Sequence, residues 1–359
     1  MKQFIKHLLA SLESGYRYIH IYRHEKAALV AKKHLWKEIQ LTAEQQKEIR
    51  GIYGNRVSNK WHRLYQAYTG RYNKDYFPEI LFSAKLEPVL CPRDICTVLQ
   101  DKSLVEILYA SVPGLKFPKT IVLNCSGIYY DGNRNIINRD LAIGYVEYWS
   151  RNADFIIKPT INAGSGKKLP EARKESGLGK DQIGELFDRY GENYIIQECI
   201  TNCGELNSIY DKALHTFQVM TYILGDKLYH TPPVLRLGRS GSGTEQELYI
   251  GVGNDGRLRR EAYSYEGERY IVHPDSGAVF ENVEIPGVQK IIECAFFCHK
   301  KTPHTKFITW DFAVDKNNNP VLIEVNMLGH SSWFLQLVYG EGIFGEHTKQ
   351  MLELIGMGQ

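Results

Sequence analysis

Residues 308–326 read ITWDFAVDKNNNPVLIEVN, two β-rich runs on either side of a polar turn. β-Branched and aromatic residues flanking an Asn-rich turn predict an antiparallel hairpin. Side chains two apart on a strand share a face, so Glu324 and Asn326 point the same way, and antiparallel pairing can bring Asp311 opposite them. Two carboxylates and an amide oxygen are hard ligands that suit Mg²⁺, and nucleotide phosphates can complete its shell. Spacing alone leaves a second interpretation open, in which Asp311 and Glu324 face solvent on an exposed sheet.

A lysine and a glycine-rich loop upstream favour the first interpretation. Residues 155–169 read FIIKPTINAGSGKKL, so Lys158 ends an apolar run and Gly164, Ser165 and Gly166 follow in a flexible loop. Glycines let backbone N–H groups approach phosphate oxygens, and a lysine on a buried strand adds a fixed positive charge. The glycine spacing differs from that of the phosphate loop GxxxxGK[ST].

Two further elements complete the predicted nucleotide site. A second lysine, Lys102, lies in LQDKSL, on a stretch that we predict to be helical. The run YIIQECI ends a predicted strand with Gln197 and Glu198, and the backbone of the next residues, Cys199 and Ile200, is placed to pair with an adenine edge. We interpret this element as a hinge between lobes, where ligand-binding crevices commonly form.

The composition is that of a soluble globular protein, with 359 residues, 43% of them apolar and 24% charged, and a net charge of +3. This charge is too weak and diffuse to indicate nucleic-acid binding, although phosphate-bearing substrates are compatible with it. No apolar run approaches the ~18 residues of a membrane span, and the N-terminus lacks the apolar core of a signal peptide. We therefore expect a cytoplasmic protein whose seven cysteines are free thiols.

The hydrophobic patterns predict an α+β protein in three regions. Residues 1–75 are expected to be helical, 76–150 to form a linking α/β segment, and 151–359 to hold most strands, antiparallel and divided into two lobes hinged near 197–204. The basic and aromatic residues of the first region fit a solvated helical face, or a docking surface for a partner or a membrane edge. The oligomeric state stays open, and a homo-oligomer is compatible with the sequence.

With these elements in order, the sequence resembles the ATP-grasp superfamily. It is most similar to the branch associated with sugar transfer in surface-polysaccharide gene clusters. The motifs that carry this similarity are FPEILFSAKLEPVL, QDK followed by FPKTIV, FIIKPT, YIIQECI, VLRLGRSGSG, HPDSG and TWDFAVDKNNNPVLIEVN. The resemblance covers residues 75–345, and the last motif is the most specific.

The resemblance implies an ATP-grasp fold in which two α+β lobes grip ATP. It places Lys102 and Lys158 on the ATP phosphates, with the loop 164–166 closing over them. Glu198 and Ile200 would hold adenine. Asp311, Glu324 and Asn326, already singled out by their spacing, would position Mg²⁺.

The acceptor side is assigned less directly. Arg236 and Arg239 are candidates for holding an anionic substrate and for stabilising transition-state charge. His273 and His330 are candidate acid–base residues. The alternatives are surface arginines and structural histidines.

The implied activity is that of an ATP-dependent ligase. Such enzymes phosphorylate a carboxylate, and an amine then captures the acyl phosphate to form an amide; the substrates here would be small molecules, plausibly linked to a sugar used in glycan assembly. Two alternatives stay open: a kinase that uses the same nucleotide site, and a nucleotide-binding module without turnover.

Overall fold

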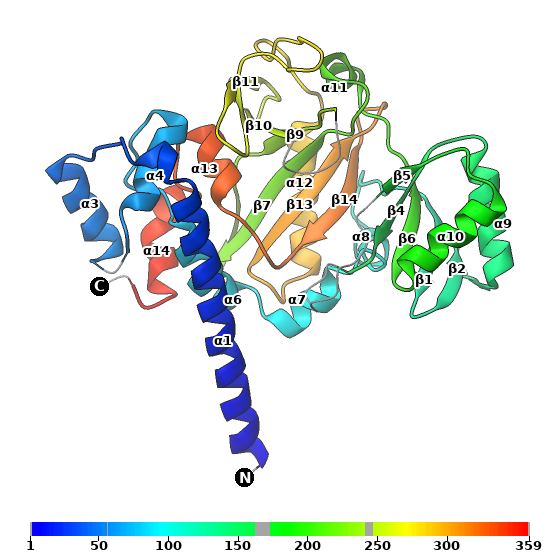
Figure 1. The fold of residues 1–359 in the computed structure, drawn as a ribbon, viewed down its shortest axis with the longest axis horizontal. Coiled ribbons are helices and arrows are strands. Elements are labelled where there is room, and N and C mark those ends of the chain that lie inside the picture. The colour runs from blue at the N-terminus through cyan, green and yellow to red at the C-terminus, as the bar shows by residue number, and fades with distance from the viewer. Residues whose placement is uncertain (1, 56, 162–172, 241–246, 358–359) are drawn as a thin grey trace.

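The structure is a computed structural model that describes residues 2–55, 57–161, 173–240 and 247–357. Its N-terminal part is helical, as predicted. The described helices before the first strand are α1 (Lys2–Ala31), α2 (Lys33–Trp36), α3 (Ala43–Tyr53), α4 (Lys60–Thr69), α5 (Glu79–Leu81), the π-helix η1 (Phe82–Leu86), α6 (Glu87–Leu90), α7 (Arg93–Leu99) and α8 (Val105–Tyr109). The N-terminal end of α1 projects away from the body of the molecule (Figure 1).

One local expectation is wrong: Lys102 lies in a turn between α7 and α8, not within a helix. The Asp101 carboxylate accepts a hydrogen bond from the Ser103 amide at 2.8 Å, a side-chain turn that competes with helical hydrogen bonding. The Lys102 amide donates to the carbonyl of Thr160 at 2.8 Å. The break in the helix therefore fixes this lysine beside the end of a strand.

A smaller sheet forms one lobe. Six described strands pair in the order β3-β2-β1-β6-β4-β5, all antiparallel. The elements of this lobe are β1 (Thr120–Cys125), β2 (Ile128–Asp131), β3 (Ile136–Ile137), α9 (Arg139–Ser150), β4 (Phe155–Pro159), β5 (Arg173–Glu175), α10 (Lys180–Tyr190) and β6 (Tyr194–Glu198). Helices α9 and α10 pack together on one face of the sheet (Figure 1), around a core that includes Val146, Phe155 and Phe187.

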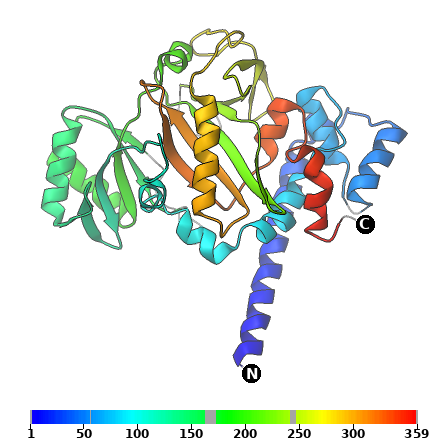
Figure 2. The same cartoon turned by 180° about the vertical axis from the view of Figure 1, so that it is seen from behind.

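A larger sheet forms the centre of the molecule. Its described strands run in the order β12-β11-β10-β9-β7-β13-β14, with β8 paired to β7. The elements of this part are α11 (Gly204–Ile209), β7 (Thr216–Leu224), β8 (Lys227–His230), β9 (Val234–Leu237), β10 (Leu248–Val252), β11 (Leu258–Ser264), β12 (Arg269–Tyr270), α12 (Val288–Lys301), β13 (Phe307–Val314) and β14 (Pro320–Asn326). Every residue of β13 is buried, because β7 and β14 flank it and α12 lies across one face (Figure 2).

The chain ends on helices that join the N-terminal region to the large sheet. They are α13 (Trp333–Tyr339), the 3₁₀ turn η3 (Gly345–His347) and α14 (Thr348–Glu353). Trp333 packs against Trp61, Tyr65 and Tyr68 of α4, with ring centroids 5.2–6.5 Å apart. Aromatic pairs of this kind contribute large buried areas, so the N-terminal helices share one core with the large sheet.

The two sheets meet at a short connection after β6. The Cys203 amide donates to the carbonyl of Val314 at 2.9 Å, and Asn202 forms an isolated bridge with Asp315. The connection is therefore attached to the β13–β14 turn. Along the part of the chain that the structure describes, none of the helices has the length and apolar character needed to cross a membrane.

Candidate functional site

The β13–β14 hairpin forms as predicted and brings three polar side chains together. In its register Asp311 faces Glu324 and Thr309 faces Asn326. The Asn326 amide nitrogen donates to Asp311 Oδ2 at 3.0 Å. The interpretation in which Asp311 faces solvent does not hold, because this side chain is only 5% exposed.

Asp311 is a buried acid with competing neighbours. Its pKa is raised to about 6, mainly by burial; the Arg236 guanidinium opposes this shift and the Glu324 charge adds to it. Among the described residues Asp311 Oδ1 has no hydrogen-bond partner. A buried oxygen left without a donor is costly, and a bound cation would satisfy it.

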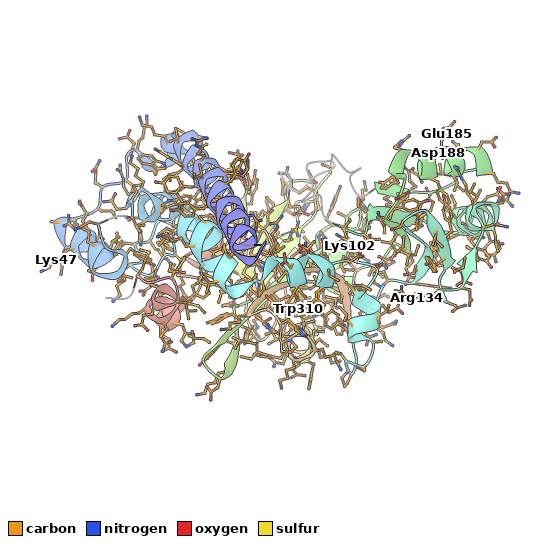
Figure 3. The ribbon with its side chains drawn as sticks, turned by 90° about the horizontal axis from the view of Figure 1, so that it is seen from below. Lys47, Lys102, Arg134, Glu185, Asp188 and Trp310 are labelled. Atoms are coloured by element: carbon orange, nitrogen blue, oxygen red, sulfur yellow. The ribbon has the colours of Figure 1, made fainter. Side chains whose placement is uncertain are left out.

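Two lysines converge on the same strand. Lys102 Nζ forms an ion pair with Glu324 Oε1 at 2.8 Å, and Lys158 Nζ donates to the carbonyl of Ile323 at 3.4 Å. Both side chains are nearly buried. Figure 3 shows Lys102 between the body that holds Trp310 and the lobe that holds Arg134. The structure thus joins predicted phosphate and metal residues from three separate segments.

The environment of Lys158 predicts a pH dependence of nucleotide affinity. Burial lowers the pKa of this lysine to about 8; Glu324 opposes that shift and Lys102 adds to it. A phosphate needs the protonated ammonium and raises its pKa on binding, so we expect ATP affinity to fall about tenfold as the pH rises from about 7 to about 9.5. Calorimetric titrations across this range measure it. Lys158→Arg, whose charge persists, should flatten the profile, and an identical profile in that variant would contradict the assignment.

A crevice lies between the sheets at the predicted hinge. It has a volume of about 490 Å³ and is lined by strand, hinge and loop residues from both lobes. Its lining residues are Pro118, Ala153, Asp154, Ile156, Lys158, Lys174, Gln197, Glu198, Cys199, Ile200, Thr201, Asn202, Asn207, Asp211, Lys212, Ala213, Leu214 and Ile323. Lys158 reaches this crevice, which therefore connects the hinge to the hairpin site.

The four predicted hinge residues divide into two pairs. The Gln197 amide donates to the Pro118 carbonyl at 3.3 Å, and Glu198 Oε1 accepts from the Lys119 amide at 2.9 Å. These two side chains therefore tie β6 to the start of β1. Cys199 and Ile200 line the crevice. The predicted loop of Gly164, Ser165 and Gly166 lies outside the described residues.

The two candidate arginines lie in different surroundings. Arg236 donates to Glu247 Oε2 at 2.7 Å through Nη2, and its Nη1 lies 3.7 Å from Asp311 Oδ2. Arg239 instead lies 3.7 Å from Asp275 Oδ2. The structure brings Arg236 to the hairpin site and places Arg239 in a separate ion pair.

The two candidate histidines are buried and engaged. His330 shares a hydrogen bond of 2.9 Å with the Thr309 hydroxyl, and burial lowers its pKa to about 3. His273 lies 3.0 Å from the Gly238 carbonyl, and burial lowers its pKa as well. Both rings are neutral near pH 7 and each is engaged by a neighbouring group, His330 by a hydroxyl and His273 by a backbone carbonyl, so their acid–base role stays a prediction.

A second cavity, of about 410 Å³, lies beside the loop that leaves β14. Glu79 accepts from the Ser332 amide at 3.0 Å, and Glu87 accepts from the His330 amide at 2.7 Å, so both glutamates hold this loop. Burial raises the pKa of Glu79 to about 8 and that of Glu87 to about 7. Helix α1 closes the cavity with residues that include Glu25.

Three glutamates near these cavities and the hairpin are not singled out by the residue pattern: Glu247 and the buried pair Glu79 and Glu87. Glu247, directly before β10, pairs with Arg236 on β9, and Glu79 contacts a loop 253 residues away. For Glu79 and Glu87, the stretch FPEILFSAKLEP does contain a signal: charged residues within an apolar helical run need buried partners.

The family follows from a match over most of the chain. A family model described as sugar-transfer associated ATP-grasp matches residues 81–351. The chain belongs to the sugar-transfer associated ATP-grasp family. This confirms the predicted family and the α+β ATP-grasp fold. The match begins after α1 to α4, so the N-terminal helices lie outside the ATP-grasp family region.

Solved structures similar to this ATP-grasp chain include several ligases. The VanG D-Ala:D-Ser ligase from Enterococcus faecalis is 16% identical with a TM-score of 0.42, over 76% of this chain and 63% of that one. D-alanyl-alanine synthetase A from Vibrio cholerae is 16% identical with a TM-score of 0.39, over 71% and 64%. The chain thus spans less than two thirds of either protein. No protein with a curated description matches it.

Proposed function

We propose that this ATP-grasp protein is an ATP-dependent ligase that joins a carboxylate to an amine through an acyl phosphate. The observation that carries the proposal is the convergence of Lys102 and Lys158 on the strand that presents Glu324 and Asn326, beside buried Asp311. Two cations next to two carboxylates suit a metal-bound triphosphate. We propose the sugar-linked, glycan-precursor substrate on the family description alone.

The hairpin residues fit Mg²⁺ when phosphates complete its shell. Among the described residues, no group of three or more His, Cys, Asp or Glu side chains forms a metal cluster. Mg²⁺ commonly takes one or two protein carboxylates together with substrate phosphates, which is the set that Asp311 and Glu324 offer beside the Asn326 amide. Held by these residues, Mg²⁺ would supply charge neutralisation on the transferred phosphoryl group.

The side chains of the protein would position the reactants for phosphoryl transfer. Lys102 and Lys158 hold phosphate oxygens, and the crevice at Cys199 and Ile200 takes the base of the nucleotide. Arg236 reaches toward Asp311 and can hold the acceptor carboxylate or developing charge near it. Phosphoryl transfer depends mainly on in-line placement and charge stabilisation, which this arrangement provides.

We place the amine in the second cavity. The loop that walls it follows Asn326 directly, and Glu25, Glu79, Glu87 and Lys32 line it. With the pKa of Glu79 raised to about 8 and that of Glu87 to about 7, the cavity offers an amine hydrogen-bond partners and an aromatic wall rather than fixed negative charge. The nucleotide in the crevice and the amine in this cavity would thus reach the hairpin from two sides.

Product analysis tests the proposal. ADP release should require Mg²⁺, a carboxylate and an amine together, because the acyl phosphate is consumed only when the amine captures it. Mixtures of uronic acids and amino acids are screened with coupled detection of ADP and mass spectrometry of products. A phosphorylated hydroxyl compound formed without any amine would identify a kinase instead. Nucleotide-dependent thermal stabilisation without ADP release from any mixture would indicate a binding module.

A further inference from the structure

A groove of about 440 Å³ outside the proposed catalytic site gathers arginines from two regions of the chain. It lies between the segment after α4, the C-terminal end of α13 and strand β11. Arg71, Arg259 and Arg260 line it together with a single carboxylate, that of Glu261. Three positive charges against one negative charge leave a formal charge of +2 in the lining.

The three guanidinium groups are not neutralised by ion pairs. Within the ranges that the structure describes, Arg71, Arg259 and Arg260 have no carboxylate within 4.0 Å and no side-chain hydrogen bond to a carbonyl. Arg259 instead lies over the Tyr339 ring, 4.5 Å from its centroid. The Glu261 carboxylate is engaged by the Tyr263 hydroxyl at 3.0 Å. The donors of all three arginines remain available to a ligand.

The backbone of β10 makes room for the stem of Arg259. A Cβ on Gly251 would lie 2.9 Å from Arg259 Cδ and 3.1 Å from the Tyr339 ring, so glycine is needed for the arginine stem to lie across β10. Gly340, by contrast, is the left-handed C-cap of α13 with φ +66°, and a Cβ there would make only ordinary contact with Arg71 Cδ, at 3.7 Å. All three arginines are solvent-exposed, and the stem of Arg259 is held by the close contact with Gly251.

A bulge in β11 explains how neighbouring arginines line one groove. Ile250 pairs with Ala262 and Val252 pairs with Leu258, so β11 carries two extra residues opposite Gly251. Adjacent residues of a regular strand point to opposite faces, and a bulge re-aims them. Arg259 and Arg260 lie within this bulge.

The end of α13 does not account for the charge. A helix C-terminus carries roughly half a negative charge at most, which one arginine would balance. The groove has a formal excess of two positive charges, and the three arginines donate to none of the helix carbonyls among the described residues.

We propose that this groove is a binding site for the phosphate group of a small anionic ligand. Planar guanidinium groups match phosphate oxygens in pairs, and the formal charge of the lining matches that of a phosphate dianion. The groove is separate from the nucleotide site: Arg236, Tyr249 and Tyr263 are register partners on β9, β10 and β11, so the groove begins roughly 10 Å across the sheet from Arg236. The proposal does not depend on the ligase activity.

Calorimetry with inorganic pyrophosphate and the full chain tests the site. The Lys158→Ala variant, whose nucleotide site is weakened, should still bind pyrophosphate. Adding Arg71→Gln and Arg259→Gln should weaken that binding about tenfold or more, since two charge-assisted contacts are lost. Arg260→Gln alone should weaken it less. Arg257→Gln is the matched control, because Arg257 is exposed, precedes β11 directly and pairs with Glu284 outside the groove.

Three results would overturn the proposed phosphate site. Binding that survives Arg71→Gln/Arg259→Gln, or that falls equally in Arg257→Gln, overturns the proposal, as does the absence of pyrophosphate binding in Lys158→Ala. Thermal unfolding verifies that the variants fold. Inorganic phosphate and glucose 1-phosphate are titrated in parallel: equal affinities assign the site to the phosphate group alone, and tighter binding of glucose 1-phosphate assigns it to a phosphorylated organic ligand.

Discussion

Glu324→Ala is expected to lower Mg²⁺-ATP-dependent turnover about 100-fold or more while the protein stays folded. The loss has two sources. The variant removes a carboxylate from the proposed metal site, whose charge stabilisation is worth several kcal/mol, and about 1.4 kcal/mol corresponds to a tenfold change in rate. It also leaves Lys102 without the carboxylate that now lies 2.8 Å from its ammonium. Steady-state ADP release measures the effect, once a substrate pair is known.

Two further variants sharpen this test. Asn326→Ala removes the amide that contacts Asp311 without changing any charge, and it should lose turnover as well. Glu281→Gln is the control, because Glu281 is an exposed carboxylate before α12. Near wild-type turnover in either hairpin variant would show that the metal assignment is wrong.

Lys158→Ala is expected to weaken ATP binding by about 100-fold. The Lys158 side chain is 7% exposed and lines the crevice between the lobes, so its charge acts on a phosphate with little screening by solvent. Hydrogen bonds to charged groups are worth roughly 1.5–3 kcal/mol, and a partly desolvated ammonium lies at the upper end. Calorimetric titration with Mg²⁺-ATP measures the affinity.

The matched control for this experiment is Lys180→Ala. Lys180 is an exposed lysine at the start of α10 in the same lobe. Its replacement should leave ATP affinity unchanged. Equal affinities for Lys158→Ala and the wild type would reject the phosphate role of Lys158, whatever the control does.

The hairpin and the position of its three polar side chains could be predicted because their geometry is local. A strand repeats every two residues, and the Asn-rich turn sets the pairing, so the spacing of Asp311, Glu324 and Asn326 predicts that they can meet, although spacing alone does not tell whether they face solvent. The strands that carry Lys158 and the hinge were found for the same reason. The resemblance to a known family then supplied the roles that spacing cannot.

Two kinds of contact could not be predicted from the sequence. Some join residues far apart along the chain, and others are side-chain hydrogen bonds that compete with backbone hydrogen bonds of a helix. Asp101 ends a helix by accepting from Ser103, and this single turn placed Lys102 outside the predicted helix. Glu79 holds a loop 253 residues away, a distance that no periodic pattern spans. The neutral, engaged state of His330 depends on burial by Phe82 and Phe307, which only the packed chain reveals.

The most direct test of the central claim is Mn²⁺ binding followed by electron paramagnetic resonance in the presence of ATP. Mn²⁺ takes the same oxygen ligands as Mg²⁺, and its signal reports the bound ion without any need for a substrate. We predict one tightly bound Mn²⁺ per wild-type chain when ATP is present, and loss of that ion in Glu324→Ala and in Asn326→Ala. Unchanged Mn²⁺ binding in both variants would contradict the account, because the ion would then lie away from the β13–β14 hairpin.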